Sequence, residues 1–125
     1  MLFRSVLVVV TGEFGRTPRI SYAPSSGGGE ASAPAGTTQP GRDHWPAANS
    51  MIWAGGGIRT GVVVGATNRR GEEVAERRVG PQDFLATIYR HLGIDYEHVA
   101  IPDRFGRPTP IVTHGKPIPE LTAAG

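Results

Sequence analysis

Short apolar runs alternate with long polar stretches along this chain. Residues 6–10 (VLVVV) form a continuous, largely β-branched run. Because such a run is apolar on both faces, it is typical of a buried central strand in a parallel sheet. Residues 50–54 predict a second strand, which residues 55–57 (GGG) end in a tight turn, and residues 61–65 predict a short edge or hairpin strand.

The clearest helical pattern covers residues 79–92. Pro81 suits the first helical turn, Asp83 is favoured near the positive end of the helix dipole, and Gly93 suits the C-terminal cap. One face of this helix carries the apolar side chains that would dock on the sheet: Phe84, Leu85, Ile88 and Leu92.

The segment from residue 21 to residue 40 has a different composition. Fifteen of its 20 residues are Gly, Ser, Pro or Ala, which predicts a flexible insertion without secondary structure. Both of its ends adjoin polar motifs, so the insertion could close over a site between them. Residues 95–125 are Pro-rich and are predicted to be mostly extended, with a short final strand at residues 110–112.

Composition limits the core that the chain can form. A chain of 125 residues fits one domain, residues 1–125, but Gly (18) and Pro (11) together make up nearly a quarter of it. Hydrophobic residues account for only 38%. We therefore expect a loop-rich, partial α/β domain whose apolar strands depend on a partner segment to cover them.

Charge and residue usage exclude several classes of protein. The formal net charge of +2 reflects scattered arginines without interleaved aromatic residues, so we expect no nucleic-acid partner. The chain contains no cysteine, which excludes disulfides and thiolate metal ligands. No apolar stretch approaches the ~20 residues that span a bilayer, so no membrane span is expected.

Two polar motifs carry the candidate chemistry. Residues 11–19 (TGEFGRTPR) come directly after the first strand, and residues 41–46 (GRDHWP) follow the insertion. Carboxylates and an imidazole that converge at the carboxyl end of a strand can hold a divalent metal, so Glu13, Asp43 and His44 are candidate ligands. A neutral imidazole with carboxylates suits zinc, manganese or iron better than calcium or magnesium.

Arginines beside these ligands are candidate substrate-binding residues. A guanidinium fork matches the oxygens of a phosphate or a sulfate, which makes Arg16 and Arg42 suitable partners for such an ester. More ordinary roles stay open, because these arginines could be solvated or ion-paired. Glu13 could pair with Arg16, and Asp43 could cap a turn beside a surface histidine.

The first residues of the chain are unusual. Residues 2–5 (LFRS) are what the common sequencing-adapter end CTCTTCCGATCT encodes when it is translated. We hypothesise that residues 1–5 are a non-native start within adapter sequence and that the gene continues upstream. A natural stop codon just before Met1 in the intact locus would contradict this hypothesis.

Five segments of the chain together resemble a known bacterial family. They are TGEFGRTPR, GRDHWP, AGGGIRTGVVVGAT, PQDFLATIYRHLGID, and FGRPTPIV with GKPI. On these segments the chain resembles the C-terminal part of domain-of-unknown-function family 1501, which is related to sulfatases and alkaline phosphatases. The resemblance implies the C-terminal portion of an alkaline-phosphatase-like α/β sandwich with a mostly parallel sheet. It would also place the site at the carboxyl edge of that sheet.

The resemblance also implies roles for individual residues. Glu13 would occupy a metal-binding Asp position, and Phe14 stands where a His or Asn ligand is usual. Asp43 and His44 lie where the related proteins often supply a further ligand. The catalytic nucleophile and the first acidic ligands would come from the N-terminal half of such a protein, which this chain does not contain.

The sequence thus leads to an expected function. We expect a C-terminal fragment of a metal-dependent hydrolase for phosphate or sulfate esters, inactive alone, whose partner is the missing N-terminal half. Its substrate would be a small-molecule or polymer-borne ester, and the resemblance suggests that the full-length protein is exported or periplasmic. The alternative is a non-catalytic binding or structural domain with the same fold.

Overall fold

The computed structural model describes residues 5–30 and 32–122. These residues divide into two compact units, which are described separately below. The first unit comprises residues 5–9, 52–65 and 77–122, and the second comprises residues 10–30, 32–51 and 66–76.

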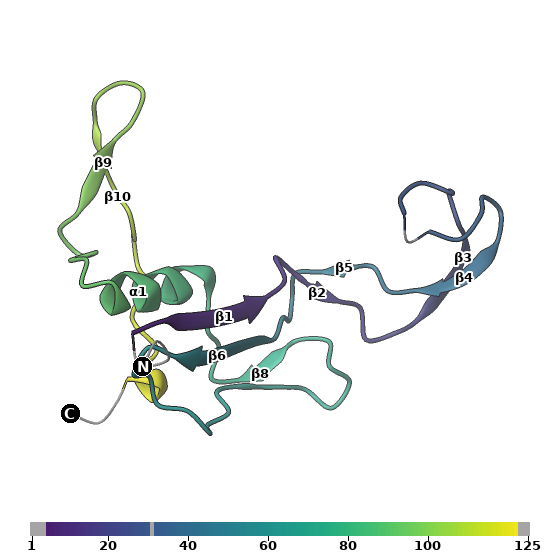
Figure 1. Cartoon of the computed structure of the whole chain (residues 1–125), viewed down its shortest axis with the longest axis horizontal. Coiled ribbons are helices and arrows are strands. Elements are labelled where there is room, and N and C mark those ends of the chain that lie inside the picture. Colours follow the sequence, from purple (N-terminus) through teal and green to yellow (C-terminus); the bar gives the residue numbers. More distant parts are fainter. Residues whose placement is uncertain (1–4, 31, 123–125) are drawn as a thin grey trace. The chain divides into compact units, whose positions relative to one another are not determined.

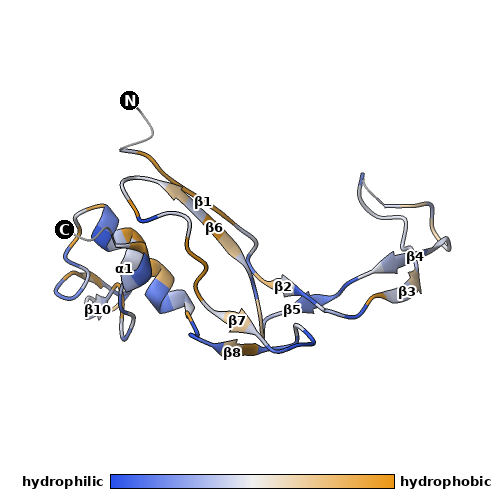
Figure 2. Cartoon of the chain, turned by 90° about the horizontal axis from the view of Figure 1, so that it is seen from below, coloured by the Kyte–Doolittle hydropathy of each residue, from blue (hydrophilic) through white to orange (hydrophobic). Residues whose placement is uncertain are grey.

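A helix and most of a strand pair form the centre of the first unit, while residues 10, 11 and 51 of the strands belong to the second unit. β1 (Leu7–Thr11) pairs with β6 (Met51–Gly55), and the two strands run in opposite directions (Figure 1). The helix α1 (Pro81–His91) docks on β6, because the ring of Phe84 meets that of Trp53 edge-on at 5.3 Å between centroids. Both strands are among the apolar parts of the chain in Figure 2. The two predicted strands and the predicted helix are therefore confirmed as elements.

Local sequence explains where α1 begins and ends. The carboxylate of Asp83 accepts a hydrogen bond from the main-chain N–H of Gly80 at 2.9 Å, which satisfies one of the donors at the start of the helix. Gly93 follows the helix with a φ of 72°, a conformation that glycine adopts without strain. Both ends agree with the sequence analysis.

The C-terminal part of the first unit adds a hairpin and a short helical turn. β9 (Ala100–Pro102) and β10 (Pro108–Pro110) are antiparallel, and η2 (Pro119–Leu121) is a 3₁₀ helix. The segment that leads to η2 packs closely on α1, since a Cβ on Gly115 would lie 2.0 Å from the carbonyl oxygen of Gln82. The buried apolar side chains of this unit are those of Ala86, Val112, Ile118 and Leu121.

The second unit consists of three short antiparallel pairs. β2 (Gly15–Arg16) pairs with β5 (His44–Trp45). β3 (Ser21–Pro24) pairs with β4 (Thr38–Gly41), and β7 (Ala66–Thr67) pairs with β8 (Val74–Glu76). The strands are two to four residues long, so turns and loops supply most of this unit.

The segment 21–40 has more order than the sequence predicts. The prediction of no secondary structure there is wrong, because β3 lies at its start and β4 at its end. Ser25, which is 7% exposed, organises the loop between them. Its hydroxyl donates to the carbonyl of Ala33 at 2.7 Å, and its main-chain N–H donates to the carbonyl of Thr37 at 2.8 Å.

The predicted fold class is wrong. The described residues form two-stranded, mostly antiparallel sheets with one α-helix; they contain no parallel sheet and no α/β sandwich. The apolar run of β1 is not buried on both faces, since Val8 is 42% and Val10 is 58% exposed. Prolines explain several of the short ribbons, because a proline cannot donate to a ladder and is confined to edge strands. β3, β4, β9 and β10 all contain proline.

Of the predictions for short segments, two strands are wrong and one turn is confirmed. Residues 61–65 form no strand, and the final strand is β10 rather than residues 110–112. The turn at residues 55–57 is confirmed, because all three glycines have φ between 60° and 75°.

The hypothesis on residues 1–5 falls on residues that, except Ser5, lie outside the described part of the chain. Within that part, no helix has the length and apolar character needed to cross a bilayer.

Candidate functional site

The pairing of β2 with β5 brings the two polar motifs together in the second unit. Arg16 is the direct partner of His44 in this ladder, and Gly15 is the partner of Trp45. The close approach depends on Gly15, because a Cβ there would lie 1.7 Å from the carbonyl oxygen of Ala48. The motifs are separated by the whole insertion in sequence, yet they form one antiparallel pair.

One face of this pair carries an aromatic and cationic cluster. Direct cross-strand partners project to the same face, so Arg16 and His44 lie side by side. The ring of Phe14 stacks on the imidazole of His44, with centroids 3.8 Å apart and planes at 30°. The guanidinium carbon of Arg16 lies 5.5 Å from the centre of the Phe14 ring, within range of a cation–π interaction. Arg16 and His44 are exposed, whereas Phe14 is half-buried.

Trp45 anchors the pair to the loop that contains residues 66–76. Consecutive strand residues point to opposite faces, so Trp45 projects away from His44. Its indole N–H donates to the main-chain carbonyl of Glu72. The side-chain oxygen of Asn68 accepts the N–H of Glu72 at 3.0 Å and shapes the same loop. Trp45 is therefore a loop-anchoring residue.

The two candidate substrate-binding arginines bind main-chain carbonyls. Arg42 donates from Nη2 to the carbonyl of Arg16 at 3.1 Å and from Nε to the carbonyl of Thr17. Arg16 in turn donates one hydrogen bond, from Nη1 to the carbonyl of Arg42 at 3.1 Å. The main chains of Thr17 and Asp43 are also joined, by a 3.0 Å hydrogen bond. These reciprocal bonds fix the distance between the two motifs.

The three predicted metal ligands belong to these motifs and are exposed. Asp43 and His44 are consecutive at the start of β5, and Glu13 precedes β2. Their donor atoms are of the type that zinc, manganese or iron accepts. Across residues 5–30 and 32–122, however, no three His, Asp or Glu side chains gather closely enough to hold a metal ion. A metal bound at this motif would need ligands from elsewhere.

Comparison with known proteins places the chain in a family. The family described as "Protein of unknown function (DUF1501)" matches residues 1–122. The chain belongs to the DUF1501 family. No match was found among curated proteins or among solved structures. The family assignment that the sequence suggested is thus confirmed, and the DUF1501 description states no activity.

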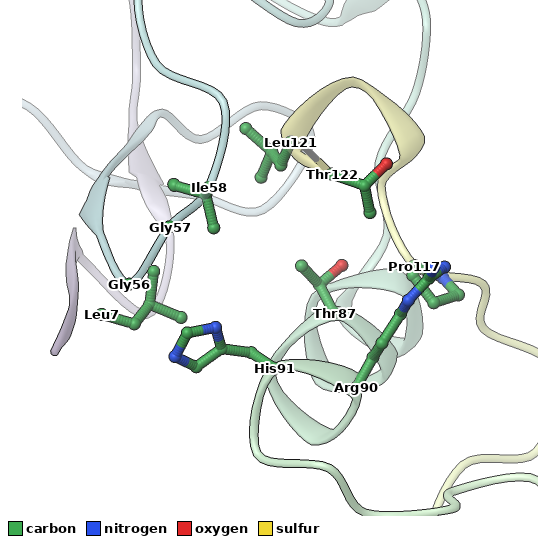
Figure 3. Close-up of a pocket in the computed structure, with 10 residues that line it drawn as sticks. All are labelled: Leu7, Gly56, Gly57, Ile58, Thr87, Arg90, His91, Pro117, Leu121 and Thr122. Atoms are coloured by element: carbon green, nitrogen blue, oxygen red, sulfur yellow. The ribbon is translucent and has the colours of Figure 1, made fainter. Parts of the chain in front are cut away.

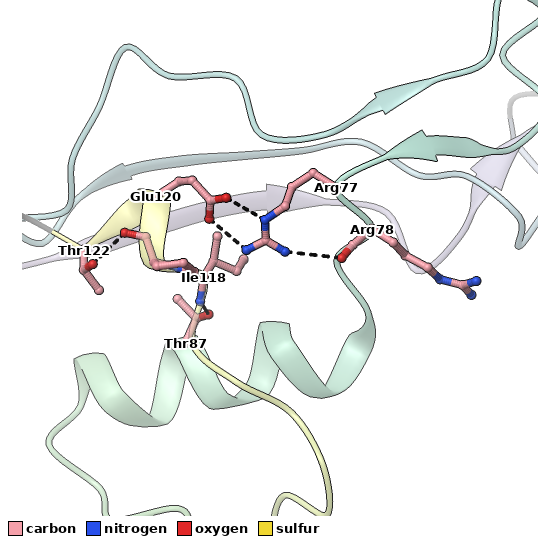
Figure 4. Close-up of polar contacts among 7 residues, drawn as sticks. Arg77, Arg78, Thr87, Ile118, Glu120 and Thr122 are labelled. Atoms are coloured by element: carbon pink, nitrogen blue, oxygen red, sulfur yellow. Dashed lines mark hydrogen bonds and ion pairs between the residues drawn. The ribbon is translucent and has the colours of Figure 1, made fainter.

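The structure of this DUF1501 chain also contains a polar cluster in the first unit that the sequence analysis did not identify (Figure 4). Arg77 and Glu120 form a paired contact, with 2.8 Å between Nη2 and Oε2, and each stabilises the other's charged form. The contact raises the pKa of Arg77 and lowers the pKa of Glu120. Thr87 accepts the main-chain N–H of Ile118 at 3.0 Å. Neither contact has a local sequence signal, because the partners are more than 30 residues apart.

Proposed function

We propose that this chain contributes part of the metal site of a hydrolase that acts on phosphate or sulfate esters. The pairing of β2 with β5 supports this proposal, because it sets Arg16 directly beside His44 on one exposed face. Two residue types that suit an anion and a metal thereby come together from motifs far apart in the sequence. The relation of the DUF1501 family to sulfatases and alkaline phosphatases, which the sequence resemblance implies, is part of the same proposal.

The proposal divides the site between this chain and another segment. Asp43 and His44 would hold a divalent zinc, manganese or iron ion, with Glu13 as a candidate third ligand. Such an ion supplies Lewis-acid polarisation of an ester oxygen when it is bound. The nucleophile and the remaining ligands would come from the N-terminal half of a longer, exported protein. The 125-residue chain alone is accordingly expected to be inactive.

The two arginines would have different tasks. Arg16 uses Nη1 for the carbonyl of Arg42, and a guanidinium has five N–H donors, so its other donors can bind ester oxygens. Arg42 directs Nε and Nη2 to main-chain carbonyls. We therefore assign ester binding to Arg16 and the positioning of Arg16 to Arg42.

A non-catalytic binding domain is the second candidate. The stack of Phe14 on His44 favours it, because an aromatic ring covers one face of the imidazole. In this alternative the stack and the arginine–carbonyl bonds serve only to hold the two motifs together. Metal binding separates the two candidates.

Calorimetric titration with zinc and manganese chlorides tests the metal ligands. We expect the longer protein, encoded when the reading frame is extended upstream, to bind one of these ions, and its Asp43→Ala/His44→Ala variant to bind it at least about 10-fold more weakly. Asp95→Ala/His98→Ala is the matched control, since it removes another exposed Asp–His pair, 3.0 Å apart in the first unit. Equal losses in both variants, or no binding by the longer protein, would favour the non-catalytic candidate.

Activity is tested on the longer protein encoded when the reading frame is extended upstream. That protein is expected to hydrolyse p-nitrophenyl phosphate or p-nitrophenyl sulfate. Replacing Arg16 with Gln should lower kcat/KM by about 100-fold, because the ester loses a charged hydrogen-bond donor. Arg19→Gln, an arginine of the same motif without an assigned role, is the control. Unchanged kinetics in Arg16→Gln would remove this residue from the site.

A further inference from the structure

A pocket of about 270 Å³ lies within the first unit, and none of the residues that line it belongs to the two polar motifs (Figure 3). The C-terminal half of α1 forms one side of it, and the glycine turn after β6 forms another. Residues from the C-terminal segment close a third side of the pocket. Much of the pocket wall is apolar, and its apolar side chains are those of Leu7, Ile58, Pro117 and Leu121.

Two basic residues of the last turn of α1 border this pocket. They are Arg90 and His91. Among residues 5–30 and 32–122, neither side chain makes an ion pair or a side-chain hydrogen bond. Two acidic groups of the same unit already have partners. Asp83 accepts the N–H of Lys116, and Glu120 is bound to Arg77.

The imidazole of His91 is held against the glycine turn. A Cβ on Gly56 would lie 2.5 Å from Cε1 and 3.0 Å from Nε2 of His91, so the ring edge packs directly on this main chain. Gly56 has a φ of 60°, which also favours glycine. Arg90 lies on the other side of the lining, near Pro117 (Figure 3). The pocket therefore has one packed basic side chain and one exposed basic side chain.

We propose that this pocket binds a small carboxylate with a compact apolar body. The carboxylate would accept hydrogen bonds from the guanidinium of Arg90, whose geometry matches two oxygens. The body would lie against Ile58 and Leu121. The volume is slightly below that of pockets for drug-sized ligands, which restricts the ligand to a small molecule or the end of a larger one. This site is independent of the proposed hydrolase function.

Benzoate is a suitable probe because it joins a carboxylate to a compact ring. We would titrate the ¹⁵N-labelled chain with benzoate and follow amide chemical shifts by NMR. The expected shifts are concentrated at residues 56–58, 87–91 and 121–122. Benzyl alcohol, which has the same ring without the charge, should bind about fivefold more weakly, as expected for the loss of one exposed ionic contact.

Variants test the role assigned to Arg90. Arg90→Gln should weaken benzoate binding by about fivefold, and Arg90→Lys should retain part of it. Arg104→Gln removes the same charge from the β9–β10 hairpin and should leave binding unchanged. Equal binding of benzyl alcohol, equal effects of Arg90→Gln and Arg104→Gln, or shifts spread over the chain would each overturn the proposal.

A free acid and the C-terminal carboxylate of a peptide share this chemistry. N-acetylphenylalanine carries the carboxylate as it occurs at the end of a peptide. If it binds at the same residues more tightly than benzoate, the proposal holds with a peptide terminus as the ligand. If benzoate binds more tightly, the proposal holds with a free small acid.

Discussion

At the scale of single residues, Gly15 has the strictest steric requirement in the candidate site. A Cβ at this position would meet the main chain of Ala48, which cannot move aside as a flexible side chain could. We expect Gly15→Ala to lower the free energy of unfolding of the second unit by about 1–3 kcal/mol, the usual cost of overpacking. Urea denaturation followed by the fluorescence of Trp45 measures this change in a Trp53→Phe background, because Trp53 of the first unit is the second tryptophan of the chain.

Gly41→Ala is the control for this substitution. No atom lies within 4 Å of a Cβ on Gly41. Its φ is not in the left-handed range. Alanine should therefore be neutral, or it should stabilise the unit by up to about 1 kcal/mol because it lowers the conformational entropy of the unfolded chain. Equal destabilisation by the two variants would mean that the approach of Gly15 to Ala48 is not the cause.

The sequence identified part of the candidate site but not its contacts. It selected the two motifs and their polar residues, and these motifs do pair through Arg16 and His44. The stack of Phe14 on His44 depends on the register of that pair, which no local pattern specifies. The hydrogen bonds of Arg42 end on main-chain carbonyls. Because every residue carries a main-chain carbonyl, the residue types in the sequence do not indicate which carbonyl accepts such a hydrogen bond.

At the scale of elements, helix α1 was predictable and the sheets were not. A helix is specified by nearby residues, here Pro81, Asp83 and Gly93, and each acts within one turn. A strand needs a partner, and the apolar run of β1 is compatible with a central strand as well as with a two-stranded pair. β3 and β4 were missed because their residues, such as Pro24 and Pro40, have low strand propensity.

The start of α1 should make stability depend on pH. The main-chain N–H groups of Lys116 and Gly80 donate to the carboxylate of Asp83 and lower the pKa of that carboxyl from its ordinary value. Since the folded-state pKa is depressed, this stabilisation is present above the unfolded value of ~3.9 and is lost as pH falls through the folded value. Glu120, whose pKa is lowered by Arg77, acts in the same direction.

Asp83→Asn isolates the contribution of this carboxylate. We expect the variant to lose about 1–3 kcal/mol at pH 7, because two N–H donors lose a charged acceptor. Its free energy of unfolding should also fall less steeply than that of the parent chain between pH 5 and pH 2. Circular dichroism during urea denaturation at several pH values measures both effects. Glu76→Gln, an exposed carboxylate of β8, is the control, and parallel pH profiles for Asp83→Asn and the parent would contradict the assignment.

At the scale of the whole molecule, buried apolar contacts are unevenly distributed. Among residues 5–30 and 32–122, all buried apolar side chains belong to the first unit, and Ser25 is the buried side chain of the second. Several large apolar side chains remain exposed on strands, including Val10 at 58% and Ile52 at 66%. This distribution is consistent with the expectation that another segment covers the strands, and it predicts different local stabilities within the chain.

Hydrogen exchange followed by mass spectrometry measures these local stabilities. Amides open most easily where few buried contacts hold the surrounding structure, so exchange should be slowest in α1 and fastest in β3 and β4. Within the first unit, Thr87→Val tests the link between packing and protection, because it removes the hydroxyl that accepts the N–H of Ile118 while keeping a similar volume. We expect faster exchange at residues 115–122 in this variant and no change in the β3–β4 hairpin. Slower exchange in β3 and β4 than in α1 would show instead that the ladder around Ser25, and not the small apolar core, is the most stable part of the chain.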